Sequence, residues 1–188
     1  MANFTKKAIR DSFVKLLNEK PLNKITVRDI VDDCGVNRNT FYYYYQDIPE
    51  LVYSIINDDI DRFISEYPAV DSIEEAISSA MEFVLTNKNA VMHIYNSVNR
   101  ALYERYQWKL CSYIAATFVD GVLGNDEFSI EDRDIVVEYW KCVSFGLIMS
   151  WLESGMKPDA LKRMNRIIEL KSNEIKNMIE KCKIKTKN

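Results

Sequence analysis

The sequence is short of glycine and proline, with five and four of them in 188 residues. These residues supply most of the tight turns between β-strands, so their scarcity argues against a β-rich fold. Apolar residues recur instead at helical spacing along most of the chain. We therefore predict an all-α protein.

Histidine and cysteine are also scarce. His93 is the single histidine, and Cys34, Cys111, Cys142 and Cys182 lie far apart with no CxxC pair. Metal sites and Ser-His or Cys-His catalysis need such residues in close groups. The sequence has no glycine-rich phosphate loop either. We expect reduced cysteines, no metal, no cofactor and no enzymatic activity.

Long hydrophobic runs are missing as well. The N-terminal letters MANFTKKAIR lack the apolar stretch of a signal peptide, and no window approaches the ~18 uninterrupted apolar residues of a membrane span. We expect a cytoplasmic protein that makes no contact with a membrane.

The net charge of −3 is unevenly distributed along the chain. Residues 1–46 contain eight lysines and arginines against five aspartates and glutamates, a net charge of +3, which leaves −6 on the remainder. A basic N-terminal segment followed by an acidic remainder is typical of a protein whose N-terminal part binds a polyanion.

The basic N-terminal segment has the apolar spacing and the capping residues of helices. A stripe of apolar residues that begins with Phe4 predicts a helix over residues 3–18. Thr26, followed three residues later by Asp29, forms a capping box for a second helix, which Gly35 ends.

A third helix follows almost at once. Asn37 is the cap candidate for a helix over residues 38–45, and Asp47 for a fourth helix over about 48–66. Two short helices joined by a tight turn and braced by a longer one describe a helix-turn-helix. An ordinary corner in a helical bundle uses the same turn chemistry and is the alternative.

Five aromatic residues in succession, Phe41 to Tyr45, lie in the third predicted helix. Phe41 and Tyr45 are four residues apart, share a helical face and are predicted to pack on the first two helices. Asn39 and Tyr43 share another face, flanked by an arginine and a further tyrosine. Arginine can bind guanine, asparagine can bind adenine, and a tyrosine ring can contact a thymine methyl group. This second face suits DNA, although it could instead form a protein interface.

The letters ITVRDI at 25–30 and CGVNRNTFY at 34–42, with Leu51, resemble the N-terminal signature of the tetracycline-repressor (TetR) family of bacterial regulators. The resemblance covers about residues 5–55 and implies a three-helix DNA-binding domain. The DNA-contacting residues that it implies are Thr26, Arg28, Asn37, Arg38, Asn39, Thr40, Tyr42, Tyr43 and Tyr44. The family usually has His where Tyr44 stands and Lys where Ile48 stands, so we expect modest, salt-sensitive binding.

The rest of the chain predicts a larger helical bundle for regulation and dimerisation, with a domain boundary between residues 1–47 and 48–188. A capping box at Ser72 predicts one of its helices, and the last two are predicted over about 129–154 and 158–182. The letters FGLIMSWLESGM at 145–156 are similar to a regulatory domain in part of the family, whose relatives include regulators of dihydroxyacetone kinase operons.

The last two predicted helices carry apolar stripes, which suit either an internal core or, as the resemblance implies, a homodimer interface. Residues of the middle helices are candidates for the wall of a ligand pocket, although a plain helical core uses the same residue types. These candidates are Met92, His93, Tyr95, Tyr103 and Trp108. A histidine with no functional duty is the alternative for His93.

These features predict a homodimeric transcriptional regulator, a repressor, that binds a palindromic operator in double-stranded DNA. A small-molecule or protein effector is expected to control it. The alternative is a co-regulator that acts mainly through protein contact, as in dihydroxyacetone kinase operon control.

Overall fold

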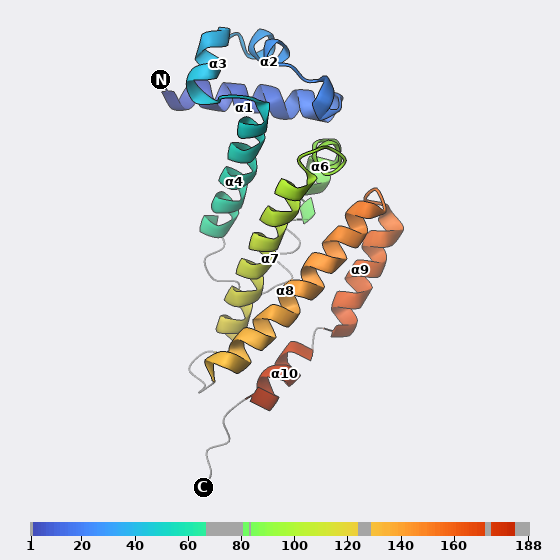
Figure 1. Cartoon of the computed structure of the whole chain (residues 1–188). Helices are drawn as coiled ribbons and strands as arrows, with labels where there is room; N and C mark the ends of the chain where they lie inside the picture. The colour runs from blue at the N-terminus through green and yellow to red at the C-terminus, as the bar shows by residue number, and fades with distance from the viewer. Residues whose placement is uncertain (1, 67–80, 83, 124–128, 172–173, 183–188) are drawn as a thin grey trace. The chain divides into compact units, whose positions relative to one another are not determined.

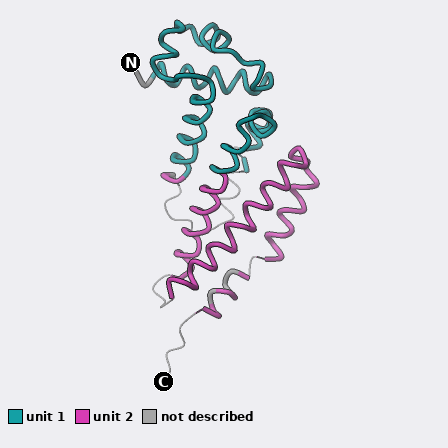
Figure 2. Tube along the Cα trace, viewed as in Figure 1, with its two compact units in different colours: residues 1–63, 81–106 teal, residues 64–80, 107–188 magenta. Residues whose placement is uncertain are grey.

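The computed structural model describes residues 2–66, 81–82, 84–123, 129–171 and 174–182. All the regular structure in these residues is helical, so the protein is all-α as predicted (Figure 1). The chain forms two compact units, one of residues 1–63 and 81–106 and the other of residues 64–80 and 107–188 (Figure 2). We call them unit 1 and unit 2. The predicted domain boundary after residue 47 stays a prediction.

Unit 1 contains the predicted helix-turn-helix. Its elements are α1 (Ala2–Glu19), the 3₁₀ turn η1 (Leu22–Lys24), α2 (Val27–Cys34), α3 (Arg38–Tyr44), most of α4 (Ile48–Glu66), α6 (Lys88–Tyr95) and the start of α7 (Arg100–Leu123). Helix α1 packs against α2 and α6, and α2 packs against α3. Inside this core the buried hydroxyl of Ser12 donates to the carbonyl of Ile30 at 3.1 Å, which satisfies a polar group that burial would otherwise penalise.

The ends of the short helices are where their caps predict them. The Thr26 and Asp29 side chains each accept from the other residue's backbone N–H, at 3.2 and 2.8 Å, and so form the predicted capping box of α2. Gly35 ends α2 in the left-handed conformation, with φ of 71°. Asn37 caps α3 by accepting from the backbone N–H of Thr40 at 2.8 Å, and Asp47 does the same for Glu50 at the start of α4.

The apolar stripe of the first predicted helix is not buried along its whole length. Phe4 belongs to the apolar stripe by its spacing, but its side chain is exposed, whereas Ile9 and Phe13 of the same stripe are buried. Phe4 lies in the first turn of α1, eight residues before Ser12, whose hydroxyl contacts α2.

Unit 2 contains the remainder of α7 together with α8 (Ile130–Glu153), α9 (Pro158–Lys171) and α10 (Glu174–Cys182). Val119 and Leu123 of α7 pack against Val136 of α8 to form a buried cluster. A bidentate ion pair joins the same two helices, with Arg133 Nε 2.7 Å from Asp120 Oδ1 and Arg133 Nη2 2.8 Å from Asp120 Oδ2. Ser129 caps α8 as predicted.

Two predicted helices of the C-terminal part extend into residues that the structure does not describe. The helix expected from the Ser72 capping box begins outside the described residues. The final helix predicted over 158–182 is described as α9 and α10, and residues 172–173 between them lie outside the described part of the chain.

Candidate nucleic-acid interface

The aromatic run separates by direction as predicted. Phe41 is 0% exposed and Tyr45 is also buried, so these two rings anchor α3 to the rest of unit 1. Tyr43 is 81% exposed and Tyr42 is exposed as well. A helix with rings on both sides therefore has one face inside the core and one face in solvent.

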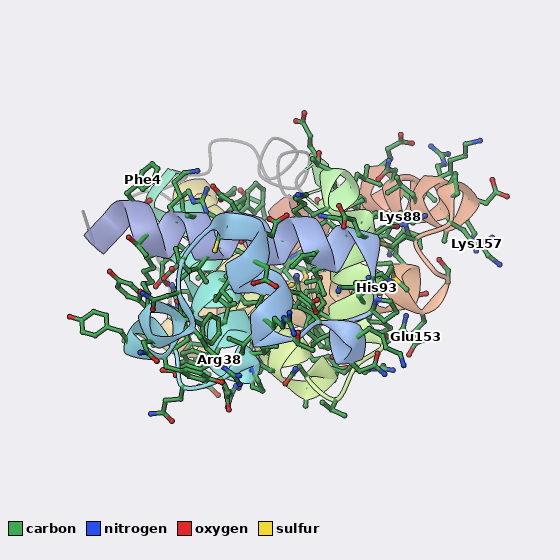
Figure 3. All side chains as sticks on the ribbon, turned by 90° about the horizontal axis from the view of Figure 1, so that it is seen from above. Phe4, Arg38, Lys88, His93, Glu153 and Lys157 are labelled. Carbon is green, nitrogen blue, oxygen red and sulfur yellow. The ribbon has the colours of Figure 1, made fainter. Side chains whose placement is uncertain are left out.

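The exposed face of α3 consists of Arg38, Asn39, Tyr42 and Tyr43, which we call the α3 face. The guanidinium of Arg38 donates to the hydroxyl of Tyr42 at 3.1 Å and lies 5.5 Å from the centroid of its ring. Figure 3 looks from above onto α1, α2 and α3 of unit 1 and labels Arg38. A neutral partner holds Arg38, so its positive charge remains available to an anion.

Arg28 extends from α2, the other short helix of the motif. Its side chain is 85% exposed, and its Nε donates to the carboxylate of Asp32 at 3.4 Å, one helical turn along α2. This pair was not predicted from the sequence, although the i, i+4 spacing of the two residues would have indicated it.

Three predicted DNA-contacting residues take part in helix caps. The Thr26 hydroxyl both donates to and accepts from Asp29, and the Asn37 side-chain oxygen accepts from the backbone and the hydroxyl of Thr40. Tyr44 is half-buried, with its ring 5.0 Å from that of Tyr43. The three capping residues hold the motif in shape, and the contacts of all four residues with DNA remain predictions.

The α2 cap makes the motif sensitive to acid. Hydrogen bonds from the backbone and hydroxyl of Thr26, with the ammonium of Lys20, lower the pKa of Asp29 from 3.8 to about 2. The folded state therefore holds the ionised carboxylate more firmly than the unfolded state does. The stabilisation is present above the ordinary pKa of 3.8 and is lost as the pH falls from there toward 2.

We expect Asp29→Asn to remove this part of the acid sensitivity. Thermal unfolding followed by circular dichroism between about pH 5 and pH 2.5 should show the wild type approaching the variant as the pH falls. Other carboxylates titrate in both proteins, so the difference between the two curves is the measured quantity. A difference that stays constant with pH would contradict the assignment.

Ion pairs connect α1 to α4, the helix that follows the motif. Arg10 pairs with Asp59, and Lys6 lies 3.6 Å from Asp58. The side chains of Arg10 and Asp59 are largely buried, so solvent screens this pair less than the others of the motif. These contacts between distant segments were not predicted from the sequence.

Helix α6 is joined to the C-terminal end of α1 by hydrogen bonds. The Asn18 side-chain oxygen accepts from the backbone N–H of Ala90 at 3.2 Å, and His93 Nδ1 lies 2.7 Å from the carbonyl oxygen of Leu17. A carbonyl oxygen only accepts, so Nδ1 carries the proton. Figure 3 shows His93 beside this end of α1. His93 therefore has a structural contact within unit 1.

The other candidate ligand residues fall in both units. Tyr95 and Tyr103 are buried in unit 1 with ring centroids 6.5 Å apart, while Met92 is half-buried on α6. Trp108 belongs to unit 2, where it contacts the Phe145 ring and the Lys141 ammonium. A shallow depression on α8 includes none of the five candidates and is lined by Ile130, Glu131, Asp134, Ile135 and Glu138. Ligand binding by the candidates remains a prediction.

Comparison with protein families gives two matches. Residues 71–181 match the family described as "Transcriptional regulator C-terminal region" (TetR_C_8), and residues 9–55 match "Bacterial regulatory proteins, tetR family". The first match covers more than half of the chain. No curated protein matches the sequence.

Solved structures share the fold. One is named "Dihydroxyacetone kinase operon activator DhaS", with a TM-score of 0.77 and 17% identity over 96% of this chain and 98% of that chain. Another is the crystal structure of a TetR transcriptional regulator from Rhodococcus sp. RHA1, with a TM-score of 0.55 and 18% identity over 88% and 95% of the two chains. At these identities the likeness concerns the fold.

Proposed function

Because the chain belongs to the tetR family of bacterial regulatory proteins, we propose that it binds a specific DNA operator as a homodimer and represses transcription from it. The operator is palindromic, since two-fold related recognition helices meet two-fold related half-sites. An effector releases the protein from DNA. The protein acts in the cytoplasm.

The α3 face is the observation that carries the proposal. Tyr43 is 81% exposed beside Asn39 and Arg38, whereas the buried Phe41 fixes the same helix to the core. Tyr42 and Tyr43 expose two neighbouring aromatic rings on one helical face, and apolar surface gathered in one place can mark a binding site. Arginine, asparagine and tyrosine supply the hydrogen bonds and the apolar contact that base edges in the major groove accept.

The exposed surface of unit 2 supports a homodimer. Only 17% of the most apolar 18-residue window of α8 is buried. Ile135, Tyr139, Cys142 and Gly146 recur at intervals of four, three and four residues and are all exposed, so they form one face, which we call the α8 face. Length and composition would also allow α8 to cross a membrane, but one such helix is weak evidence, since core helices of soluble proteins meet the same criteria. A second copy that covers the α8 face by two-fold symmetry removes this apolar surface from water.

Control by an effector rests on the connection between α1 and the two helices that hold it. The pairs Arg10–Asp59 and Asn18–Ala90 tie α1 to α4 and α6. A ligand that moves α4 or α6 would then move the helix-turn-helix, which changes the spacing of the two recognition helices in a dimer. Tyr95 of α6 and Tyr103 of α7 are the proposed ligand contacts in unit 1.

A co-regulator is the second candidate. The structure named as a dihydroxyacetone kinase operon activator matches nearly the full length of both chains. In this alternative the α3 face contacts a protein partner, and regulation is positive. This candidate would be favoured if the protein does not bind DNA but binds a protein partner through the α3 face.

Gel-shift and footprinting assays on the DNA upstream of the protein's own gene test the proposal. We expect a protected region with two-fold symmetry. Arg28→Ala should weaken operator binding by about 1–3 kcal/mol and relax the preference at one base pair of each half-site. Lys7→Ala, a change at an exposed lysine of α1, should weaken binding to all sequences alike. Equal effects of the two variants on every DNA would contradict this division of roles.

A further inference from the structure

The two arginines of the proposed DNA surface have different partners in the free protein. Arg38 is held by the neutral hydroxyl and ring of Tyr42, whereas Arg28 is held by the carboxylate of Asp32. The Arg28–Asp32 pair is formed within α2, and its side chains are 85% and 67% exposed. Arg28 thus meets DNA with its charge already balanced by a neighbour.

Asp32 differs from the other two acidic residues of α2. Asp29 completes the capping box at the start of the helix, and Asp33 pairs with Lys15 and so joins α2 to α1. Within the described residues, the hydrogen bond and the ion pair that Asp32 makes both go to Arg28. Removing Asp32 therefore leaves the contacts between helices intact.

We propose that Asp32 is a specificity-determining residue that restricts Arg28 to base pairs able to satisfy both side chains. This inference rests on the proposed DNA binding. On DNA of arbitrary sequence, a phosphate must compete with Asp32 for Arg28, and the released carboxylate then faces a polyanion. In the operator, Arg28 binds O6 and N7 of a guanine, and Asp32 accepts from the amino group of a cytosine. The carboxylate therefore weakens binding to arbitrary DNA more than binding to the operator.

The test compares Asp32→Asn with Asp33→Asn, a matched control. Each change removes one negative charge from α2 and frees one basic side chain from its ion pair, Arg28 in the first variant and Lys15 in the second. Fluorescence anisotropy measures affinity for the footprinted operator and for a scrambled duplex of equal length and composition. We expect Asp32→Asn to tighten binding to the scrambled duplex about fourfold more than binding to the operator, since an i, i+4 pair contributes roughly a factor of two per protomer. Asp33→Asn should change both affinities by the same factor.

A double-mutant cycle separates the pair from the general charge effect. In an Arg28→Ala background, Asp32→Asn should change the affinities for the operator and for the scrambled duplex by the same factor, as Asp33→Asn does. Asp32→Ala provides a second variant, and circular dichroism melting verifies that all variants are folded. Equal effects of Asp32→Asn on both duplexes, or an undiminished effect without Arg28, would overturn the inference while DNA binding stands. Failure of the wild-type protein to bind the operator would instead overturn the proposed function.

Discussion

Replacing Phe41 by alanine is expected to destabilise the helix-turn-helix by about 3–5 kcal/mol, since the ring is 0% exposed and its removal leaves a cavity. A typical domain has only about 5–15 kcal/mol of stability in total. The ring also lies 5.8 Å from that of Tyr45, which would lose a packing partner. Urea denaturation followed by circular dichroism measures the loss, and specific DNA binding should disappear with it.

Tyr43→Ala is the matched control, two residues along the same helix. Because Tyr43 is 81% exposed, its truncation should change the free energy of unfolding by no more than about 0.5 kcal/mol. Operator binding should nevertheless weaken by about 1–3 kcal/mol. Comparable losses of stability in the two variants would show that the inward and outward faces of α3 have been assigned wrongly.

Gly146→Arg is expected to convert the proposed dimer into a folded monomer. Gly146 is exposed in the middle of the α8 face, and a Cβ added there meets no atom within 4 Å, so a side chain fits in the isolated chain. In a dimer the same side chain occupies the space that the second copy needs. Analytical ultracentrifugation should show the change in mass, and operator affinity should fall by about 10²–10⁴-fold, because the two half-sites are no longer bound together.

Ala101→Arg is the control for the size and charge of the new side chain. Ala101 is likewise a small exposed residue of a helix, but it lies on α7 in unit 1 and outside the α8 face. This variant should remain dimeric and keep its operator affinity. A Gly146→Arg protein that is still dimeric would show that α8 does not meet a second copy at this face.

Local patterns predicted much of the candidate site. The caps at Thr26 and Asn37 and the end at Gly35 follow from hydrogen bonds and backbone preferences within one helical turn. The separation of Phe41 from Tyr43 follows from helical periodicity alone. Periodicity placed Phe4 in the apolar stripe of α1, but it shows which residues share a face and not how far along the helix a neighbour covers that face.

Residues 1–66 thus determined by themselves where each short helix begins and ends and which side chains of α3 turn inward, since all these interactions lie within a few residues of one another. Only the tertiary structure decided that α6 meets the end of α1 through Asn18 and His93, and that Arg10 pairs with Asp59 of α4. Asn18 and Ala90 are 72 residues apart in sequence. Such contacts depend on how whole helices pack, and no short-range pattern of residue types records that.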